Sequence, residues 1–294
     1  MRVLLAWDAS SSHNCFLNCV DCYAWPPGTI FCIATVVEPL PDLVPDLASE
    51  LMARAATKAE GYAAGLHAKG LEVIAVARQG DPGDVIVHEA EAFHADLIIL
   101  GAPTSARPLH LVTGSVARRV LRFAHCSVMI CRPPPGTGEG AAKGFRVLVP
   151  VDGSEYSNGA VASLTLRPWP EGSVFEVVSV VEPVSASVKY LYPGYNESAE
   201  ASRIRAATMQ AAQDAIKAAE STLTAGGLKV MDTVMVPLAA PDELIIEEAA
   251  RWQADLVVVG SHGRRGVTRF LLGSISEAVA LHAGCSVEVY RHRE

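Results

Sequence analysis

Glycines and small polar residues in the second half of the chain have the spacing of an anion-binding turn. The segment Gly260-Ser261-His262-Gly263 follows the apolar run 256–259, and nine residues separate it from Gly273-Ser274. A short, β-branched apolar run is typical of a strand buried in a parallel sheet. Glycine lets the backbone approach a ligand closely, and the free N–H groups at the start of a helix attract anions. The spacing therefore predicts a cradle in which two glycine contacts hold one polyphosphate.

The first half of the chain holds an altered version of this segment. Gly101 and Gly114-Ser115 keep the spacing, but Thr104 stands where the second half has Gly263, and Pro103 precedes it. A Cβ atom at that position crowds the approach to phosphate, and proline removes a backbone N–H. We therefore expect a degenerate site in the first half.

Both halves are copies of one repeat, which must position these segments. In the chain of 294 residues, 2–8 matches 146–152 at an offset of 144, and 95–101 matches 254–260 at an offset of 159. The middle of the second copy is thus longer by 15 residues. Residues 133–140 are rich in proline and glycine, which is typical of an exposed connection.

This repetition predicts two domains, which we call the first and second repeats. The first repeat covers 1–132, the linker covers 133–144, and the second repeat covers 145–294. A length of about 150 residues for each unit fits the usual size of a domain.

Strands and helices alternate within each repeat, which predicts an α/β fold with two tandem, doubly wound, five-stranded parallel sheets. Ligands of such sheets bind at the carboxyl ends of the strands, where both glycine turns lie. We also expect the last strands, 128–130 and 287–290, to pair and cover exposed sheet edges. The expected strands are 2–7, 29–36, 71–77, 96–100, 127–131, 146–151, 173–180, 229–236, 255–259 and 286–290.

Composition excludes several classes of partner. The net charge of −8 argues against nucleic acid, which demands a basic face. Half of the residues are hydrophobic, yet no apolar run approaches the roughly 18 residues of a membrane span. The chain reaches Trp7-Asp8 before any apolar signal region forms, so we expect a cytoplasmic protein.

Together these residues resemble the universal stress protein family, in its tandem two-domain form, over nearly all of both repeats. The family's ATP-binding signature is Gly, two residues, Gly, nine residues, then Gly followed by Ser or Thr. Gly260, Gly263, Gly273 and Ser274 match it fully. The resemblance implies a Rossmann-like fold of the adenine nucleotide alpha hydrolase type.

The resemblance also implies an ATP site with Mg²⁺ bound to the phosphates. Residues after the first strand of the second repeat would border the nucleoside, a valine of the next strand would contact adenine, and the glycines and the helix start would hold the phosphates. Arg264, Arg265 and Arg269 would either screen the outer phosphates or form an exposed loop. The implied site is Pro150, Val151, Asp152, Val180, Val259, Gly260, His262, Gly263, Gly273, Ser274 and Ile275.

In the first repeat, only part of this set is kept. The matching residues are Asp8, Val36, Gly101, Gly114 and Ser115. Trp7 replaces Val151, and its indole would fill or line the adenine pocket. We expect an empty or degenerate site, with weak or altered binding as the alternative.

Cys15, Cys19 and Cys22 have the C-x3-C-x2-C spacing of iron–sulfur sites in radical enzymes that use S-adenosylmethionine. Steps of four and three place the three thiols on one face of a helix. We favour packing, because no barrel-length chain surrounds them; a metal or redox sensor, with His13 as a fourth zinc ligand, is the alternative. All seven cysteines are expected to remain thiols in a cytoplasmic protein.

The function implied is regulatory binding of ATP by the second repeat, in a stress response, and not enzymatic turnover. An unknown protein partner would detect the bound state, and two chains could add a dimer interface. A slow ATPase at the same site is one alternative, although His262 and Asp152 are its sole candidates for a base. A sensor on the cysteine helix is the other.

Overall fold

The computed structural model describes residues 1–7, 20–39, 45–101, 114–132, 144–181, 199–237, 240–263 and 272–292. The strands are β1 (Arg2–Trp7), β2 (Ile30–Val37), β3 (Glu72–Gln79), β4 (Leu97–Gly101), β5 (Ser127–Cys131), β6 (Arg146–Pro150), β7 (Val174–Val181), β8 (Val230–Pro237), β9 (Leu256–Gly260) and β10 (Ser286–Tyr290). The helices are α2 (Pro45–His67), α3 (Pro82–Ala92), α4 (Ser115–Phe123), α5 (Glu155–Thr165), α7 (Ala199–Ala225), α8 (Pro241–Arg251) and α9 (Ser274–His282).

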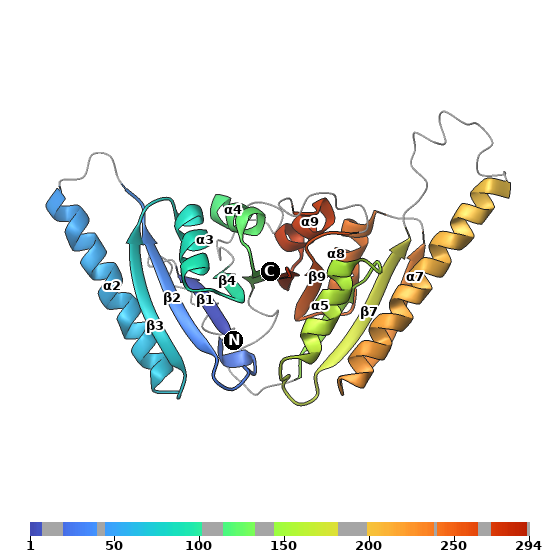
Figure 1. Cartoon of the computed structure of the whole chain (residues 1–294), viewed down its shortest axis with the longest axis horizontal. Helices are drawn as coiled ribbons and strands as arrows, with labels where there is room; N and C mark the ends of the chain where they lie inside the picture. Colours follow the sequence, from blue (N-terminus) through green and yellow to red (C-terminus); the bar gives the residue numbers. More distant parts are fainter. Residues whose placement is uncertain are drawn as a thin grey trace.

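All ten strands form one sheet in the order β3-β2-β1-β4-β5-β10-β9-β6-β7-β8. Each repeat contributes five parallel strands, as the alternation of the sequence predicted. The strand order reverses beside β1 in the first repeat and beside β6 in the second. In Figure 1 the sheet twists from α2 at one end to α7 at the other, with α4 and α9 side by side at the centre.

Helices cover both faces of the sheet, because alternate residues of each strand point to opposite sides. Val3 and Leu5 belong to the core under α2, α5 and α7, whereas Leu4 belongs to the core under α3, α4, α8 and α9. Each core runs through both repeats. The near-continuous apolar strands are what burial on both faces requires. No described helix is long and apolar enough to span a membrane.

The two repeats meet through their last strands. β10 pairs antiparallel with β5, with Val287 opposite Ile130 and Val289 opposite Val128. The pairing expected from the sequence is therefore observed, and it leaves β3 and β8 as the two edge strands of the sheet.

Equivalent contacts stabilise the first strand of each repeat. The Arg2 backbone N–H donates to Asp96 at 2.7 Å, and the Arg146 N–H donates to Asp255 at 2.8 Å. The Arg2 guanidinium also lies over the Phe93 ring, 4.3 Å from its centroid. The two copies thus fold through the same local interactions.

A cluster of aromatic rings packs at the junction between the two repeats. Tyr23 stacks on Phe145 with ring centroids 4.6 Å apart, although the two residues come from different repeats. Trp25 meets Phe31 edge-on, and Trp169 meets Phe175 in the same way, both at 5.2 Å. This cluster adds apolar packing to the β5–β10 ladder.

Candidate functional site

The predicted nucleotide residues of the second repeat gather at the carboxyl ends of three neighbouring strands. Pro150 ends β6, Val180 lies one residue before the end of β7, and Val259 and Gly260 end β9. Because these strands are parallel, their carboxyl ends share one edge of the sheet. The strand order also reverses here, which is where ligands of such sheets bind.

Two hydrogen bonds attach the start of α9 to the glycine turn. The Gly273 N–H donates to the Ser261 carbonyl at 2.8 Å, and the Ser276 hydroxyl donates to the Gly260 carbonyl at 2.6 Å. The sequence did not identify Ser276 as a site residue. A small polar residue in the first turn of the helix was the available signal.

The start of α9 carries no side-chain cap. Gly273 is its N-cap residue, and no described side chain accepts a hydrogen bond at this end. Ser274, the first helical residue, is exposed, while Ile275 packs partly into the core. An uncapped helix start presents backbone N–H groups and the positive end of the helix dipole, which together favour an anion.

The two glycines of the turn are needed for different physical reasons. A Cβ atom on Gly260 would lie 2.7 Å from the Tyr156 backbone carbon, so Gly260 is required by the packing of β9 against α5. A Cβ atom on Gly263 would lie 2.9 Å from a carboxylate oxygen of Asp152. Gly263 therefore borders a predicted site residue, whereas Gly260 is a requirement of the fold.

Ser154 connects the loop after β6 to the glycine turn. Its N–H donates to the Asp152 carboxylate at 2.9 Å, and its hydroxyl donates to the His262 carbonyl at 3.3 Å. Ser154 is also the N-cap of α5, because its side chain accepts from the Ser157 N–H. A capping serine outside the predicted set thus fixes Asp152 against the turn.

His262 is buried at the centre of the turn, with 6% of its surface exposed. Its Nδ1 lies 3.2 Å from the Ser261 hydroxyl, and its ring packs on Tyr156 at 4.7 Å. Its Nε2 is buried without a hydrogen-bond partner among the described residues. Burial, and to a smaller extent the charge of Arg291, lowers the pKa of His262 below its usual range.

Val151 contributes to the site mainly through its backbone. Its N–H donates to the Val178 carbonyl at 2.8 Å, and its side chain is buried under α5 and α7. Val180 and Val259 lie on the opposite face of the sheet, against α8 and α9.

The corresponding segments of the first repeat lie only in part within the described residues. Gly114 is the N-cap of α4, again without a side-chain cap, and Ser115 is exposed after it. Gly101 ends β4 and Val36 lies near the end of β2, whereas Asp8, Pro103 and Thr104 lie outside the described residues.

Trp7 is buried in the core at the end of β1, 5% exposed. It packs edge-on against Tyr62 of α2, with the ring centroids 4.6 Å apart. Its indole therefore extends the core of the first repeat, where Val151 of the second repeat is smaller.

Comparison with known proteins gives the family. The model of the universal stress protein family matches residues 1–132 and 145–291. The chain belongs to the universal stress protein family. A universal stress protein of Methanothermobacter thermautotrophicus is 32% identical over 111 residues, which cover 35% of this chain and 75% of that protein. One from Methanocaldococcus jannaschii is 27% identical over 148 residues, 50% of this chain and 81% of that protein.

Solved structures share the fold of this chain over both repeats together. A universal stress protein from Archaeoglobus fulgidus superposes with a TM-score of 0.67 at 18% identity, covering 100% of this chain and 97% of that one. A functionally unknown protein from Pseudomonas aeruginosa superposes with a TM-score of 0.60 at 17% identity, covering 98% and 92%.

The cysteines of this universal stress protein form no described metal site. Cys22 is an exposed thiol, whereas Cys15, Cys19 and His13 lie outside the described residues, as do Arg264, Arg265 and Arg269. No group of three or more potential metal ligands occurs within the described ranges. Cys131 is disulfide-bonded, whereas the other described cysteines are thiols. The expectation that all cysteines stay reduced is wrong at Cys131.

Proposed function

We propose that the second repeat of this universal stress protein binds ATP as a regulatory ligand. The observation that carries the proposal is the uncapped start of α9, bonded through Gly273 and Ser276 to the glycine turn after β9. Helix dipole, free N–H groups and a close backbone turn meet at one point, which is the arrangement that stabilises phosphate.

Two further observations on the residues of the turn support nucleotide binding. The Nε2 atom of His262 is buried without a partner in the described structure, so the turn holds an unsatisfied polar atom next to the proposed phosphate position. Gly263 lacks the Cβ atom that would press on Asp152. Mg²⁺ would bind mainly to the phosphates, as it does when it accompanies ATP.

Regulation is the proposed role because the described site offers no evident catalytic base. Burial lowers the pKa of His262 and so makes it a weaker base, and the Asp152 carboxylate already accepts a hydrogen bond from the Ser154 N–H. Bound ATP would stabilise one conformation of the surface around the site, which requires unequal affinity for two states. A cytoplasmic protein partner, or a second copy of the chain, would detect the difference.

Calorimetry with Mg²⁺-ATP on the purified chain tests the proposal, together with identification of the nucleotide released on denaturation. One ATP bound for each chain is the expected stoichiometry, because the first repeat lacks the full motif. Absence of binding, or two equal sites, would contradict the proposal.

A slow ATPase at the same site is the second candidate, favoured by the position of His262 in the turn. Single-turnover assays with labelled ATP separate it from a binding module. Phosphate release that is lost in His262→Ala would support turnover, and no release over hours would exclude it.

A further inference from the structure

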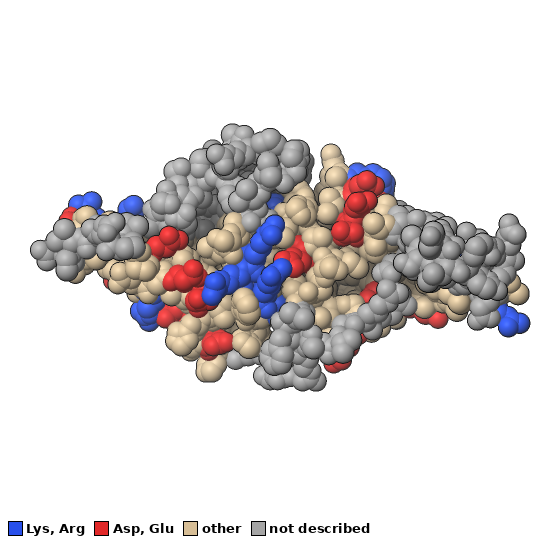
Figure 2. Space-filling model, turned by 90° about the horizontal axis from the view of Figure 1, so that it is seen from above, with Lys and Arg blue, Asp and Glu red and all other residues tan. Residues whose placement is uncertain are grey.

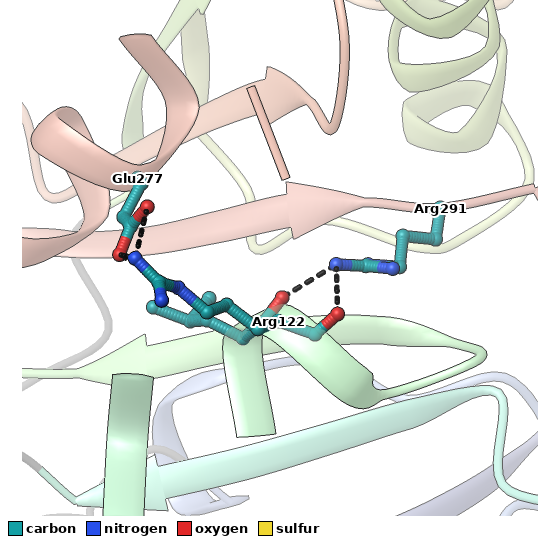
Figure 3. Close-up of polar contacts among 4 residues, drawn as sticks. Arg122, Glu277 and Arg291 are labelled. Carbon is teal, nitrogen blue, oxygen red and sulfur yellow. Dashed lines mark hydrogen bonds and ion pairs between the residues drawn. The ribbon is translucent and has the colours of Figure 1, made fainter. Parts of the chain in front are cut away.

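An ion pair connects the first repeat to the proposed phosphate helix of the second. Arg122 lies in the last turn of α4, and Glu277 lies in the first turn of α9. The Arg122 Nη2 is 3.0 Å from the Glu277 Oε1, and its Nε donates to the same oxygen at 3.3 Å. Figure 3 shows the guanidinium turned toward the carboxylate, between helices of different repeats.

Glu277 is a negative charge close to the end of α9 that would face ATP. Its N–H donates to the carbonyl of Gly273, so it lies one turn after the N-cap. Its side chain is 19% exposed and therefore only partly screened by water. An unpaired carboxylate here interacts favourably with the positive end of the helix dipole. It also repels a polyphosphate that binds at the same end.

The second repeat in turn holds Arg122 in place. The Arg291 Nη2 donates to the carbonyl of Leu121 at 2.5 Å and approaches the carbonyl of Arg122 at 3.5 Å (Figure 3). Arg291 directly follows β10, so the last turn of α4 is anchored to the sheet of the second repeat. The position of the Arg122 side chain is thus defined from both ends.

The ion pair between Arg122 and Glu277 has no equivalent at the start of α4 in the first repeat. In the repeat alignment, Leu281 matches Arg122 and Arg118 matches Glu277. The start of α4 therefore has no acidic residue in its first turn and no reciprocal partner from α9. The nucleotide motif is complete in the second repeat alone. The Arg122–Glu277 ion pair, which has no equivalent in the first repeat, therefore lies beside the proposed ATP site.

Three arginines of α4 form a basic cluster, which we define as Arg118, Arg119 and Arg122. Figure 2 shows basic side chains gathered near the middle of the face above α4 and α9. Arg119 binds Asp84 of its own repeat at 2.5 Å, and Arg122 binds Glu277 across the junction. Arg118 has no ion pair with any described residue, so it provides a matched control on the same helix.

We propose that Arg122 is a positioning residue for ATP binding by the second repeat. By neutralising Glu277, it allows the first repeat to raise the affinity of its neighbour for the phosphates. The degenerate repeat thus contributes a residue to the site of the intact one. This inference rests on the proposed function.

Calorimetry on the full chain tests it with Mg²⁺-ATP and with adenosine, which lacks the phosphates. We expect Arg122→Ala to weaken ATP binding about fivefold, the scale of a coupling of roughly 1 kcal/mol, and to leave adenosine binding unchanged. Arg122→Lys keeps the charge and should bind nearly as the parent does. Arg118→Ala should bind as the parent does, because it removes an equal charge that does not neutralise Glu277.

The variant Glu277→Gln shows whether Arg122 acts through the carboxylate. In that background, Arg122→Ala should no longer weaken ATP binding, because the repulsive charge is gone. If Arg122→Ala weakened ATP binding equally in the parent and in the Glu277→Gln background, Arg122 would contact phosphate directly, and the positioning role would be overturned. Parent-like ATP binding by Arg122→Ala, or an equal loss in Arg118→Ala, would overturn it as well.

Failure of the proposed function has a different signature. If the unaltered chain bound no ATP, the function and this inference would both be wrong. If it bound ATP and Arg122→Ala bound it equally well, only the inference would be wrong. Thermal unfolding of each variant, and its adenosine affinity, separate a lost charge from a damaged fold.

Discussion

Arg132 and Arg291 make the same hydrogen bond in opposite directions across the junction of the two repeats. Arg132 donates to the Ala280 carbonyl at the end of α9, at 2.7 Å, and Arg291 donates to the Leu121 carbonyl at the end of α4. Each arginine directly follows the last strand of its own repeat. The repeats are therefore related by an approximate two-fold axis, and each one caps the carboxyl end of α4 or α9 in the other.

We predict that Arg132→Ala and Arg291→Ala each destabilise the junction by about 1.5–3 kcal/mol, the range for a hydrogen bond to a charged group. The carbonyls at the helix ends would lose their donor and their favourable positive charge. Urea unfolding and hydrogen exchange of the amides in α4 and α9 measure the effect. Arg118→Ala serves as the exposed control, and an equal loss in that variant would contradict a specific role for the junction arginines.

Gly263→Val should remove ATP binding while preserving the fold. The new side chain begins 2.9 Å from an Asp152 oxygen, which is a side-chain atom that can move. We expect at least a roughly tenfold loss of ATP affinity with little change in melting temperature, measured by calorimetry and thermal unfolding. Thr104→Gly, at the equivalent position of the first repeat, should leave the stoichiometry at one. Unchanged affinity in Gly263→Val would overturn the site.

Gly260→Ala should behave in the opposite way. Its Cβ atom would meet backbone atoms of Tyr156 and Ser157 at 2.7 and 2.8 Å, and backbone cannot move aside as a side chain can. We predict a loss of about 1–3 kcal/mol in the free energy of unfolding, the usual cost of overpacking, measured by urea titration. A variant as stable as the parent would show that the turn is looser than this contact implies.

The repeat itself made much of the fold predictable from sequence. Each expected strand overlaps an observed one, because apolar runs such as 256–259 are needed at every strand buried on both faces. The pair Arg122 and Glu277 was not predictable. The two residues are 155 positions apart and have no counterparts of the same type, so only the packing of α4 beside α9 brings them together.

The candidate site, like the fold, was predictable from the sequence only in part. The glycine spacing located the turn, but it did not distinguish Gly260, which the fold requires, from Gly263, which borders Asp152. Ser154 and Ser276 were missed because their hydrogen bonds go to carbonyls of a distant segment. Such bonds depend on tertiary structure, and no local pattern reports them.

A buried ion pair near the junction provides a further test. Arg167 Nη1 lies 2.8 Å from Glu288 Oε2, and their side chains are only 10% and 4% exposed. Arg167→Met would leave the carboxylate buried and uncompensated, so we expect a loss of about 3–5 kcal/mol in urea unfolding. A loss below about 1 kcal/mol would show that water replaces the partner.

The first repeat supplies the design of the compensating variant. Tyr23 and Met129 occupy the positions of Arg167 and Glu288 there, and Met129 lies opposite Glu288 in the ladder. The double variant Arg167→Met, Glu288→Met should recover much of the lost stability, because an apolar pair needs no charge compensation. Simple addition of the two single losses would contradict this explanation.

The buried His262 predicts how stability depends on pH. Burial and the charge of Arg291 lower its pKa in the folded state, so the unfolded chain binds a proton more readily than the native one. This contribution to stability is fully present above the ordinary pKa of about 6.5 and is lost as the pH falls below it. Urea unfolding between about pH 5 and pH 8 should therefore give a free energy of unfolding that decreases toward acid. His262→Gln should flatten that slope, since glutamine does not titrate, and an unchanged slope would assign the effect to other groups.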